Sequence, residues 1–215
     1  RAEWGLDQSI FDQYLAYLPR LLHGDFGRSY ILQTDISSLV ATQMLPTLKL
    51  TAAALAVAIV FAVASAVFTA GKPVSRSIAG GLELTLISTP TFWLGILLLY
   101  VFSFTFKIFP VSGDRNLSAL VLPALSLGLS LGAVLGQVLR AGLARALEEP
   151  FALTVRSWGA SNLVLRLRHG LPHAAPPTVP LAGRLVGNLL SGPPLTAAVV
   201  ARPGLGRHPA HAGLS

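Results

Sequence analysis

The feature that most constrains this chain is a set of three apolar stretches, each long enough to cross a lipid bilayer. They cover residues 47–70, 82–106 and 119–139. Their only charged side chains are Lys49 and Glu83, each near the start of its stretch. The hydrocarbon core of a bilayer needs roughly 20 apolar residues in a helix. We therefore predict an all-α fold, a polytopic transmembrane helix bundle.

A fourth stretch, 179–200, is long enough to span but is less regular. It contains Arg184 and the pair Pro193-Pro194, and proline removes a helical hydrogen bond. The composition supports the membrane assignment, because 53% of the 215 residues are hydrophobic and only 12% are charged. Soluble domains carry about 25% charged residues, and disordered chains need low hydrophobicity. Both classes are therefore excluded.

The remaining composition excludes several kinds of chemistry. The chain has no cysteine, so it has no disulfide, no iron–sulfur site and no thiol nucleophile. It has no complete phosphate-binding loop. His169 and His173 have helical metal-ligand spacing, but Pro172 lies between them and no carboxylate is near. We predict no catalytic group, no cofactor, no metal site and no nucleic-acid partner.

The charges of the connecting segments predict an orientation. Residues 71–81 and 140–178 together carry seven Lys or Arg side chains against two acidic ones, whereas residues 1–46 carry three against five. Basic loops stay in the cytoplasm. We therefore expect 71–81 and 140–178 to be cytoplasmic loops and 1–46 to be external.

Two features predict how the spans are shaped and packed. Gly128, Gly132 and Gly136 recur every fourth residue, which leaves one face of a helix as bare backbone for close packing. Pro90 lies inside the stretch 82–106, where it should kink the helix. Glu83 lies near Arg76 in the sequence, and we expect an interfacial ion pair between them.

The segment 140–178 is too apolar for a simple tether. Hydrophobic residues from Phe151 to Leu167 alternate with arginines, a pattern typical of short amphipathic helices at a membrane face. Gly159 separates two such helices, and Ser161 or Asn162 is placed to cap the second. Arg156, Arg166 and Arg168 would either orient a partner or hold the helix at an anionic lipid surface. We expect this segment to be a docking surface for a soluble partner.

The chain resembles the permease subunits of ABC importers, in the dipeptide, oligopeptide and nickel branch. Six elements occur in the family's order: LHGDFGRS at 22–29, LPTL at 45–48, STPTFWLG at 88–95, FPVSG at 109–113, LPAL at 122–125 and RPGLGR at 202–207. Residues 151–177 fall on the family's EAA loop, of which Gly159 is kept. The family's glutamate and alanines fall on Leu153, Thr154 and Val155.

The resemblance implies three domains: an external segment 1–46, a permease transmembrane domain 47–200 that includes the EAA-type loop, and a truncated external tail 201–215. It implies a bacterial inner-membrane, multi-pass location. The chain would form half of a pathway for peptides, nickel or similar solutes, with a second permease subunit, ATPase subunits, an external solute-binding protein and the lipid bilayer as partners. The coupling residues would be Arg156, Ser157, Trp158, Gly159, Ala160, Ser161 and Asn162.

Two alternatives to transport are open at this point. The family's first and last spans have no counterpart here, which is expected of a truncated and inactive permease. A membrane scaffold without transport activity would also account for the apolar spans and the docking segment.

Overall fold

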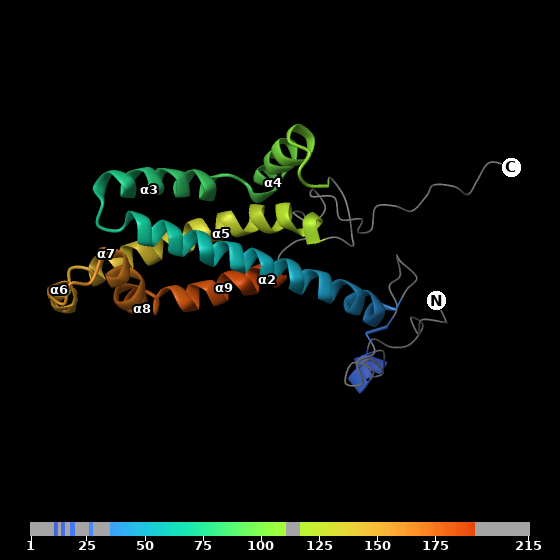
Figure 1. Ribbon diagram of the computed structural model, residues 1–215. Helices are drawn as coiled ribbons and strands as arrows, with labels where there is room; N and C mark the ends of the chain where they lie inside the picture. Colours follow the sequence, from blue (N-terminus) through green and yellow to red (C-terminus); the bar gives the residue numbers. More distant parts are fainter. Residues whose placement is uncertain are drawn as a thin grey trace. The chain divides into compact units, whose positions relative to one another are not determined.

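The computed structural model describes residues 11–12, 14–15, 18–19, 26–27, 35–110 and 117–191, and these are predominantly helical. The elements, drawn in Figure 1, are α2 (Ile36–Thr69), α3 (Pro73–Ser88), α4 (Thr91–Leu99), the π-helix η2 (Tyr100–Thr105), α5 (Leu117–Ala146), α6 (Pro150–Ser157), α7 (Asn162–Val164), the π-helix η3 (Leu165–Gly170), α8 (Leu171–Ala174) and α9 (Thr178–Ser191). The prediction of an all-α fold is confirmed.

The chain divides into two compact units, Arg1–Lys49 and Leu50–Ser215. In the first unit, local hydrogen bonds mark the start of α2. The Ile36 amide donates to the Gly27 carbonyl oxygen at 2.9 Å, and Gly27 has a φ of +77°, which glycine adopts readily. Ser38 Oγ donates to the Asp35 carbonyl oxygen at 2.7 Å. These bonds fix the turn from which α2 begins.

Among the residues that the structure describes, two unbroken helices are long and apolar enough to cross a membrane. They are Met44–Thr69, with 26 residues, and Ser118–Ala146, with 29 residues. At about 1.5 Å per residue each exceeds the roughly 30 Å of a bilayer core. They correspond to the predicted spans 47–70 and 119–139.

The predicted span 82–106 is not one straight helix. The helix α3 and the continuous helical segment formed by α4 and η2 meet at a bend of 102°, so together they form either a broken span or a re-entrant loop. The break falls at Thr89 and Pro90: Thr89 has extended backbone angles, and α4 begins at Thr91. Proline has no amide hydrogen and pushes the preceding residue out of the helical region. The helix is therefore interrupted at Pro90 and changes direction sharply, whereas the sequence predicted only a kink within one helix.

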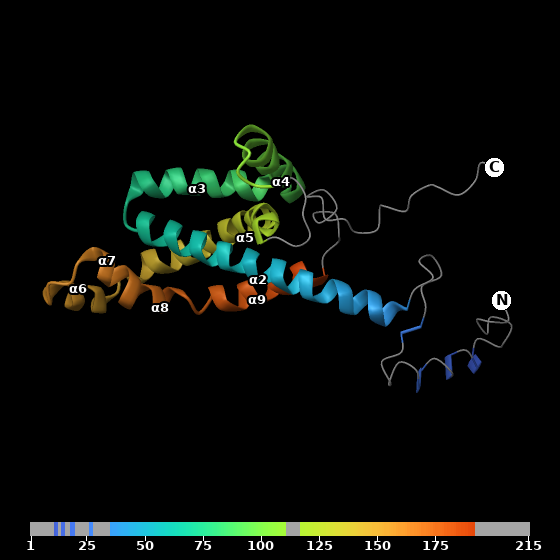
Figure 2. The same cartoon turned by 45° about the vertical axis from the view of Figure 1, so that its right-hand side comes forward.

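Two predicted loops are wrong in extent. The segment 71–81 is not a loop, because only Gly71 and Lys72 separate α2 from α3. Gly71 has a φ of +75°, the left-handed conformation that ends helices, and Pro73 begins the next helix. Similarly, α5 continues through Ala146, so the first part of 140–178 belongs to a long helix. Figure 2 shows the chain turning back from α2 into α3 at the short connection of Gly71 and Lys72.

The core of the second unit lies between α2, α5, α8 and α9. Its buried side chains are Ala58, Ala62, Ala66, Val67, Ala70, Leu135, Leu139, Leu143 and Ala174, and Leu181, Ala182 and Leu185 of α9 pack against them. The stretch 179–200 is therefore helical as far as Ser191. The remainder of that stretch, Pro193-Pro194, the tail 201–215 and the RPGLGR element lie outside the described residues, as does most of FPVSG.

Candidate functional site

The turn between α6 and α7 carries the residues for which a coupling role was predicted. The helix α6 ends at Ser157, Trp158 follows it, and Gly159 has a φ of +78° with no atom within 4 Å of the position a Cβ would take. Ser161 is the N-cap of α7, where its side chain accepts a hydrogen bond from the Val164 amide at 3.4 Å. The positive φ at this position therefore favours glycine, although there is open space for a side chain.

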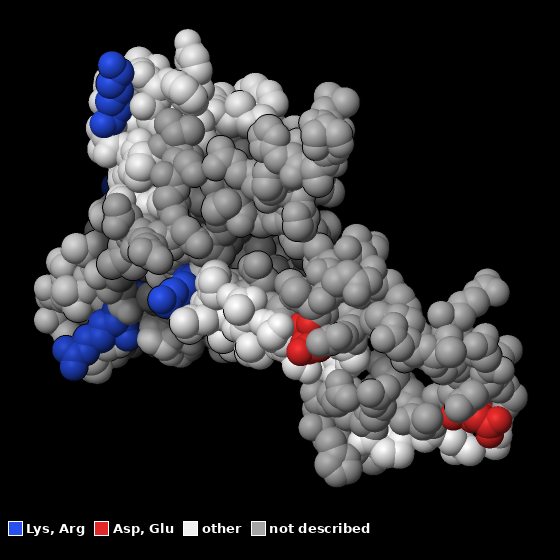
Figure 3. Space-filling model, turned by 90° about the vertical axis from the view of Figure 1, so that its right-hand side faces the viewer, with Lys and Arg blue, Asp and Glu red and all other residues white. Residues whose placement is uncertain are grey.

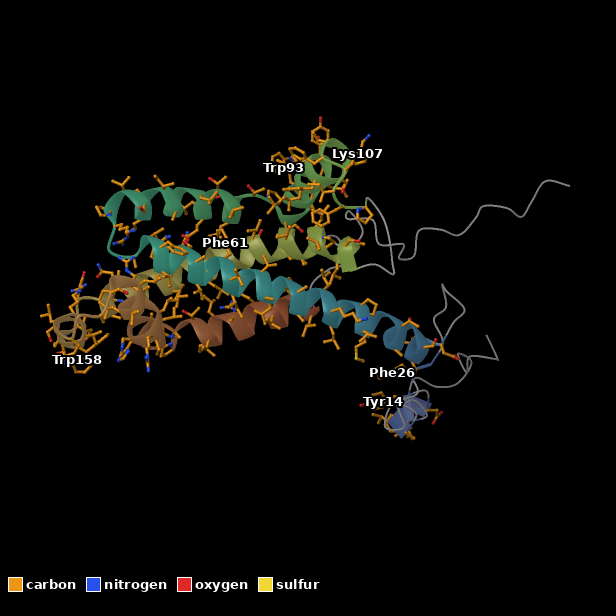
Figure 4. All side chains as sticks on the ribbon, in the orientation of Figure 1. Tyr14, Phe26, Phe61, Trp93, Lys107 and Trp158 are labelled. Atoms are coloured by element: carbon orange, nitrogen blue, oxygen red, sulfur yellow. The ribbon has the colours of Figure 1, made fainter. Side chains whose placement is uncertain are left out.

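The outer side of this turn exposes apolar side chains beside cations. The exposed fractions are 75% for Trp158 and 68% for Leu153. We name the docking face by its exposed residues: Leu153, Arg156, Trp158, Leu163, Val164, Leu167 and Arg168. Figure 4 places Trp158 at the α6 and α7 end of the second unit and Trp93 at α4. On the face drawn in Figure 3, charged side chains form small separate groups.

The inner side of the docking segment is packed. Ala152, Val155 and Leu165 form a small buried cluster, with Ala160 partly buried against it. The Phe151 ring stacks on the His173 ring, with centroids 4.5 Å apart and planes inclined by 20°. His173 Nδ1 is also 2.8 Å from the His169 carbonyl oxygen. These contacts hold α6 against η3 and α8, so the docking face is presented on a folded base.

Arg166 differs from the other arginines of this segment. Its Nη1 donates a hydrogen bond of 2.9 Å to the carbonyl oxygen of Val67, near the C-terminus of α2, where free carbonyls attract cations. Arg156 and Arg168 are exposed. The sequence had grouped all three, but the structure assigns Arg166 to fastening η3 onto α2.

The three glycines of α5 face the alanine-rich side of α2. A Cβ built on Gly128 would lie 2.6 Å from Val57 Cβ and 2.7 Å from the Ala54 carbonyl oxygen. A Cβ on Gly132 would lie 2.9 Å from the Ala58 carbonyl oxygen, and one on Gly136 would lie 3.0 Å from Glu83 Oε1. A side chain at Gly128 or Gly132 would therefore force the two helices apart.

Beside this contact lies a buried cluster of charged and polar side chains that the sequence analysis missed. Glu83 is fully buried, and Arg140 binds it through Nη1 to Oε1 at 2.9 Å and Nη2 to Oε2 at 2.5 Å. Ser65 Oγ donates to Glu83 Oε1 as well. The predicted pair of Glu83 with Arg76 is wrong, because Arg76 is exposed in the first turns of α3. Arg140 follows Gly136 by four residues and so continues the glycine face, a spacing that could have predicted its position.

Comparison with known proteins places these features in a family. Residues 58–215 match the model of the family described as "Binding-protein-dependent transport system inner membrane component". The chain is 33% identical over 213 residues to the "Glutathione transport system permease protein GsiC" of Escherichia coli (strain K12), covering 96% of this chain and 68% of that protein. It is 34% identical over 211 residues to the protein of the same name from Salmonella typhi, with the same coverage of each chain.

Proposed function

Because the chain belongs to the binding-protein-dependent transport system inner membrane components, we propose that it forms half of a peptide pathway and docks an ATPase through the docking face. As a member of this family it is a multi-pass inner-membrane permease subunit of an ABC importer of the peptide branch, and it is not an enzyme. The other half of the pathway would come from a second permease, and an external binding protein would deliver the solute.

The docking face supports the ATPase contact. It combines large exposed apolar side chains, above all Trp158 and Leu153, with the exposed cations Arg156 and Arg168 on a short helix-turn-helix. Aromatic and arginine side chains are the residues that dominate protein interfaces. A lipid surface would bind the cations too, but it would not require the specific turn at Gly159. The turn geometry is the single observation that carries this proposal.

The packing behind the docking face supports mechanical coupling. A Cβ on Gly170 would lie 2.6 Å from Leu143 Cδ1, and one on Gly142 would lie 3.1 Å from the Ala174 carbonyl oxygen. These glycines let η3 and α8 lie directly on α5. Since close-packed interiors transmit displacement with little compression, a push on the docking face would move α5 and the spans packed against it.

We propose peptides of about tripeptide size as the solute. The relatives named above are permeases of glutathione transport systems, and glutathione is a tripeptide. Nickel is the competing solute suggested by the sequence resemblance, and an uptake assay with each solute separates the two.

The test uses the assembled importer carrying Gly159→Val. A β-branched side chain is strained at positive φ, so we expect normal insertion but loss of the ATPase on purification, or ATP hydrolysis that no longer drives uptake. Gly81→Val is the matched control, because Gly81 lies in α3 with no atom within 4 Å of its Cβ position and no positive φ. Full ATPase retention and uptake in Gly159→Val would remove the docking role.

A second pair of variants tests the side-chain contact. Trp158→Ala removes the most exposed large apolar side chain of the docking face, whereas Trp93→Ala removes one that is 51% exposed on α4. We expect only Trp158→Ala to weaken ATPase retention. Equal retention by the two variants would favour the lipid-surface role for this segment.

A further inference from the structure

The helix α9 (Thr178–Ser191) packs on the core along one side and is exposed over much of its remaining circumference. Leu181, Ala182 and Leu185 pack against the core. Next to these packed residues, Gly183, Arg184, Gly187 and Asn188 are all exposed, and neither glycine has any atom within 4 Å of its Cβ position. These four residues follow the helical spacing i, i+1, i+4 and i+5, so they share one side of the helix. We call this surface the Arg184 face.

We infer that the Arg184 face lies within the depth of the bilayer, because its helix packs beside an apolar span of α5. Leu181 and Leu185 on the same two turns pack against the core cluster, whose members Leu135, Leu139 and Leu143 belong to the apolar span Ser118–Ala146. Arg184 lies about 9 Å along the helix axis from Thr178, the first residue of α9, at about 1.5 Å per residue. Ionisable residues at such depth face a water-filled cavity or a partner group rather than lipid tails.

The two arginines at this depth have different surroundings. Arg140 is buried and bound to Glu83 through two hydrogen bonds. Arg184 is exposed, and no hydrogen bond or ion pair joins it to any residue in the described part of the chain. Its guanidinium therefore offers donors to a ligand. Asn188, one turn further along, adds a carboxamide donor, and the bare glycines leave space for the ligand to approach the backbone.

We propose that the Arg184 face lines the solute pathway and binds the carboxylate of a peptide in transit. A guanidinium binds a carboxylate through two parallel hydrogen bonds, and every peptide with a free C-terminus carries that group. This inference rests on the proposed peptide pathway, which supplies the water-filled space beside α9. The site orients an anionic solute and takes part in no bond making or breaking.

Transport selectivity tests the contact. The assembled importer, reconstituted with its binding protein, is given a tripeptide as its free acid and as its C-terminal amide. Because the binding protein is unchanged, the ratio of acid to amide transport isolates the permease. We expect Arg184→Gln to lower this ratio about tenfold, as for loss of a charge-assisted hydrogen bond, and Arg184→Lys to lower it less. Arg76→Gln, at an exposed arginine of α3, should leave the ratio unchanged. An unaltered ratio in Arg184→Gln would overturn the proposal.

A labelling experiment tests the face without depending on transport. The chain has no cysteine, so Gly187→Cys introduces a single thiol. We expect an anionic methanethiosulfonate to label it in the assembled importer faster than a cationic one does, and Arg184→Gln to abolish that preference. The free-acid tripeptide should slow labelling and the amide should not. Val60→Cys, on an exposed apolar position of α2, should stay unlabelled.

The two experiments separate the possible failures. If neither form of the tripeptide is transported, the proposed solute class is wrong, while labelling still reports on the Arg184 face. An unreactive Gly187→Cys would mean that lipid or another subunit covers the face. Labelling that is equally fast with both reagents would mean that Arg184 does not face the thiol's aqueous space. Either labelling result would overturn the inference.

Discussion

The carboxylate of Glu83 in α3 and the guanidinium of Arg140 in α5 form a two-point ion pair inside the helical unit. Glu83 is 0% exposed and the Arg140 side chain 8%. Ser65 of α2 donates a third hydrogen bond to the same carboxylate, so three helices meet at one pair of charges. In apolar surroundings a charge is tolerated only when it is paired and hydrogen-bonded, and this arrangement satisfies both conditions.

We expect removal of one partner of this pair to be strongly destabilising. Glu83→Met or Arg140→Met alone would leave an unpaired buried charge, at a cost of about 3–5 kcal/mol. The double variant removes both charges and should lose less stability than either single variant. Thermal unfolding of the purified protein in detergent measures all three. A double variant that loses the sum of the single effects would contradict the direct pairing.

The glycine contact between α5 and α2 predicts sensitivity to a single methyl group. Gly128→Ala places a Cβ 2.6 Å from Val57 Cβ, and overpacking of this kind costs about 1–3 kcal/mol. Gly81→Ala, at an open helical position, is the control and should be neutral or slightly stabilising. The midpoints of thermal unfolding report the difference, and equal midpoints would show that the two helices do not pack through Gly128.

Loss of the hydrogen bond from Arg166 to Val67 should lower the local stability of η3 and the end of α2 rather than the stability of the whole fold. Arg166→Ala should raise amide exchange in η3 and at the end of α2 by about ten- to a hundredfold, since a bond from a charged donor contributes about 1.5–3 kcal/mol. Arg168→Ala changes an exposed side chain and should leave exchange there unchanged. Hydrogen–deuterium exchange with mass spectrometry resolves these segments. Indistinguishable exchange in the two variants would mean that Arg166 does not fasten η3.

The charge distribution predicts the orientation of the helices. Single cysteines at Ser75 and Ser161 should be protected from a membrane-impermeant thiol reagent in intact cells, whereas one at Lys107 should react. Figure 4 shows Lys107 at the α4 end of the second unit, away from Trp158. Reaction of all three after permeabilisation is the control. External labelling of the Ser161 variant would reverse the orientation and remove the docking role.

Much of the architecture follows from local sequence patterns. The apolar stretches predicted the two long helices because, for an apolar run of about 20 residues, a helix in lipid is more favourable than any other conformation. Pro90 marked the break between α3 and α4, since the missing amide hydrogen and the steric effect on the preceding residue act locally. The spacing of Gly128, Gly132 and Gly136 indicated the side of α5 that now lies against α2. The predicted extent of the loop 71–81 was wrong, because helix propensity alone did not show that α3 begins directly after the turn at Gly71 and Lys72.

What the sequence alone determined about this protein is its class, its long helices and the glycine side of α5 that packs, because these depend on periodicity and on single residues with special backbone chemistry. The tertiary structure decided the partners. Glu83 binds Arg140 rather than its sequence neighbour Arg76, and Arg166 fastens to Val67 while Arg156 and Arg168 stay exposed. Charged side chains find partners by distance in space, and that distance depends on how the helices turn at Gly71 and Pro90 and approach through their glycines.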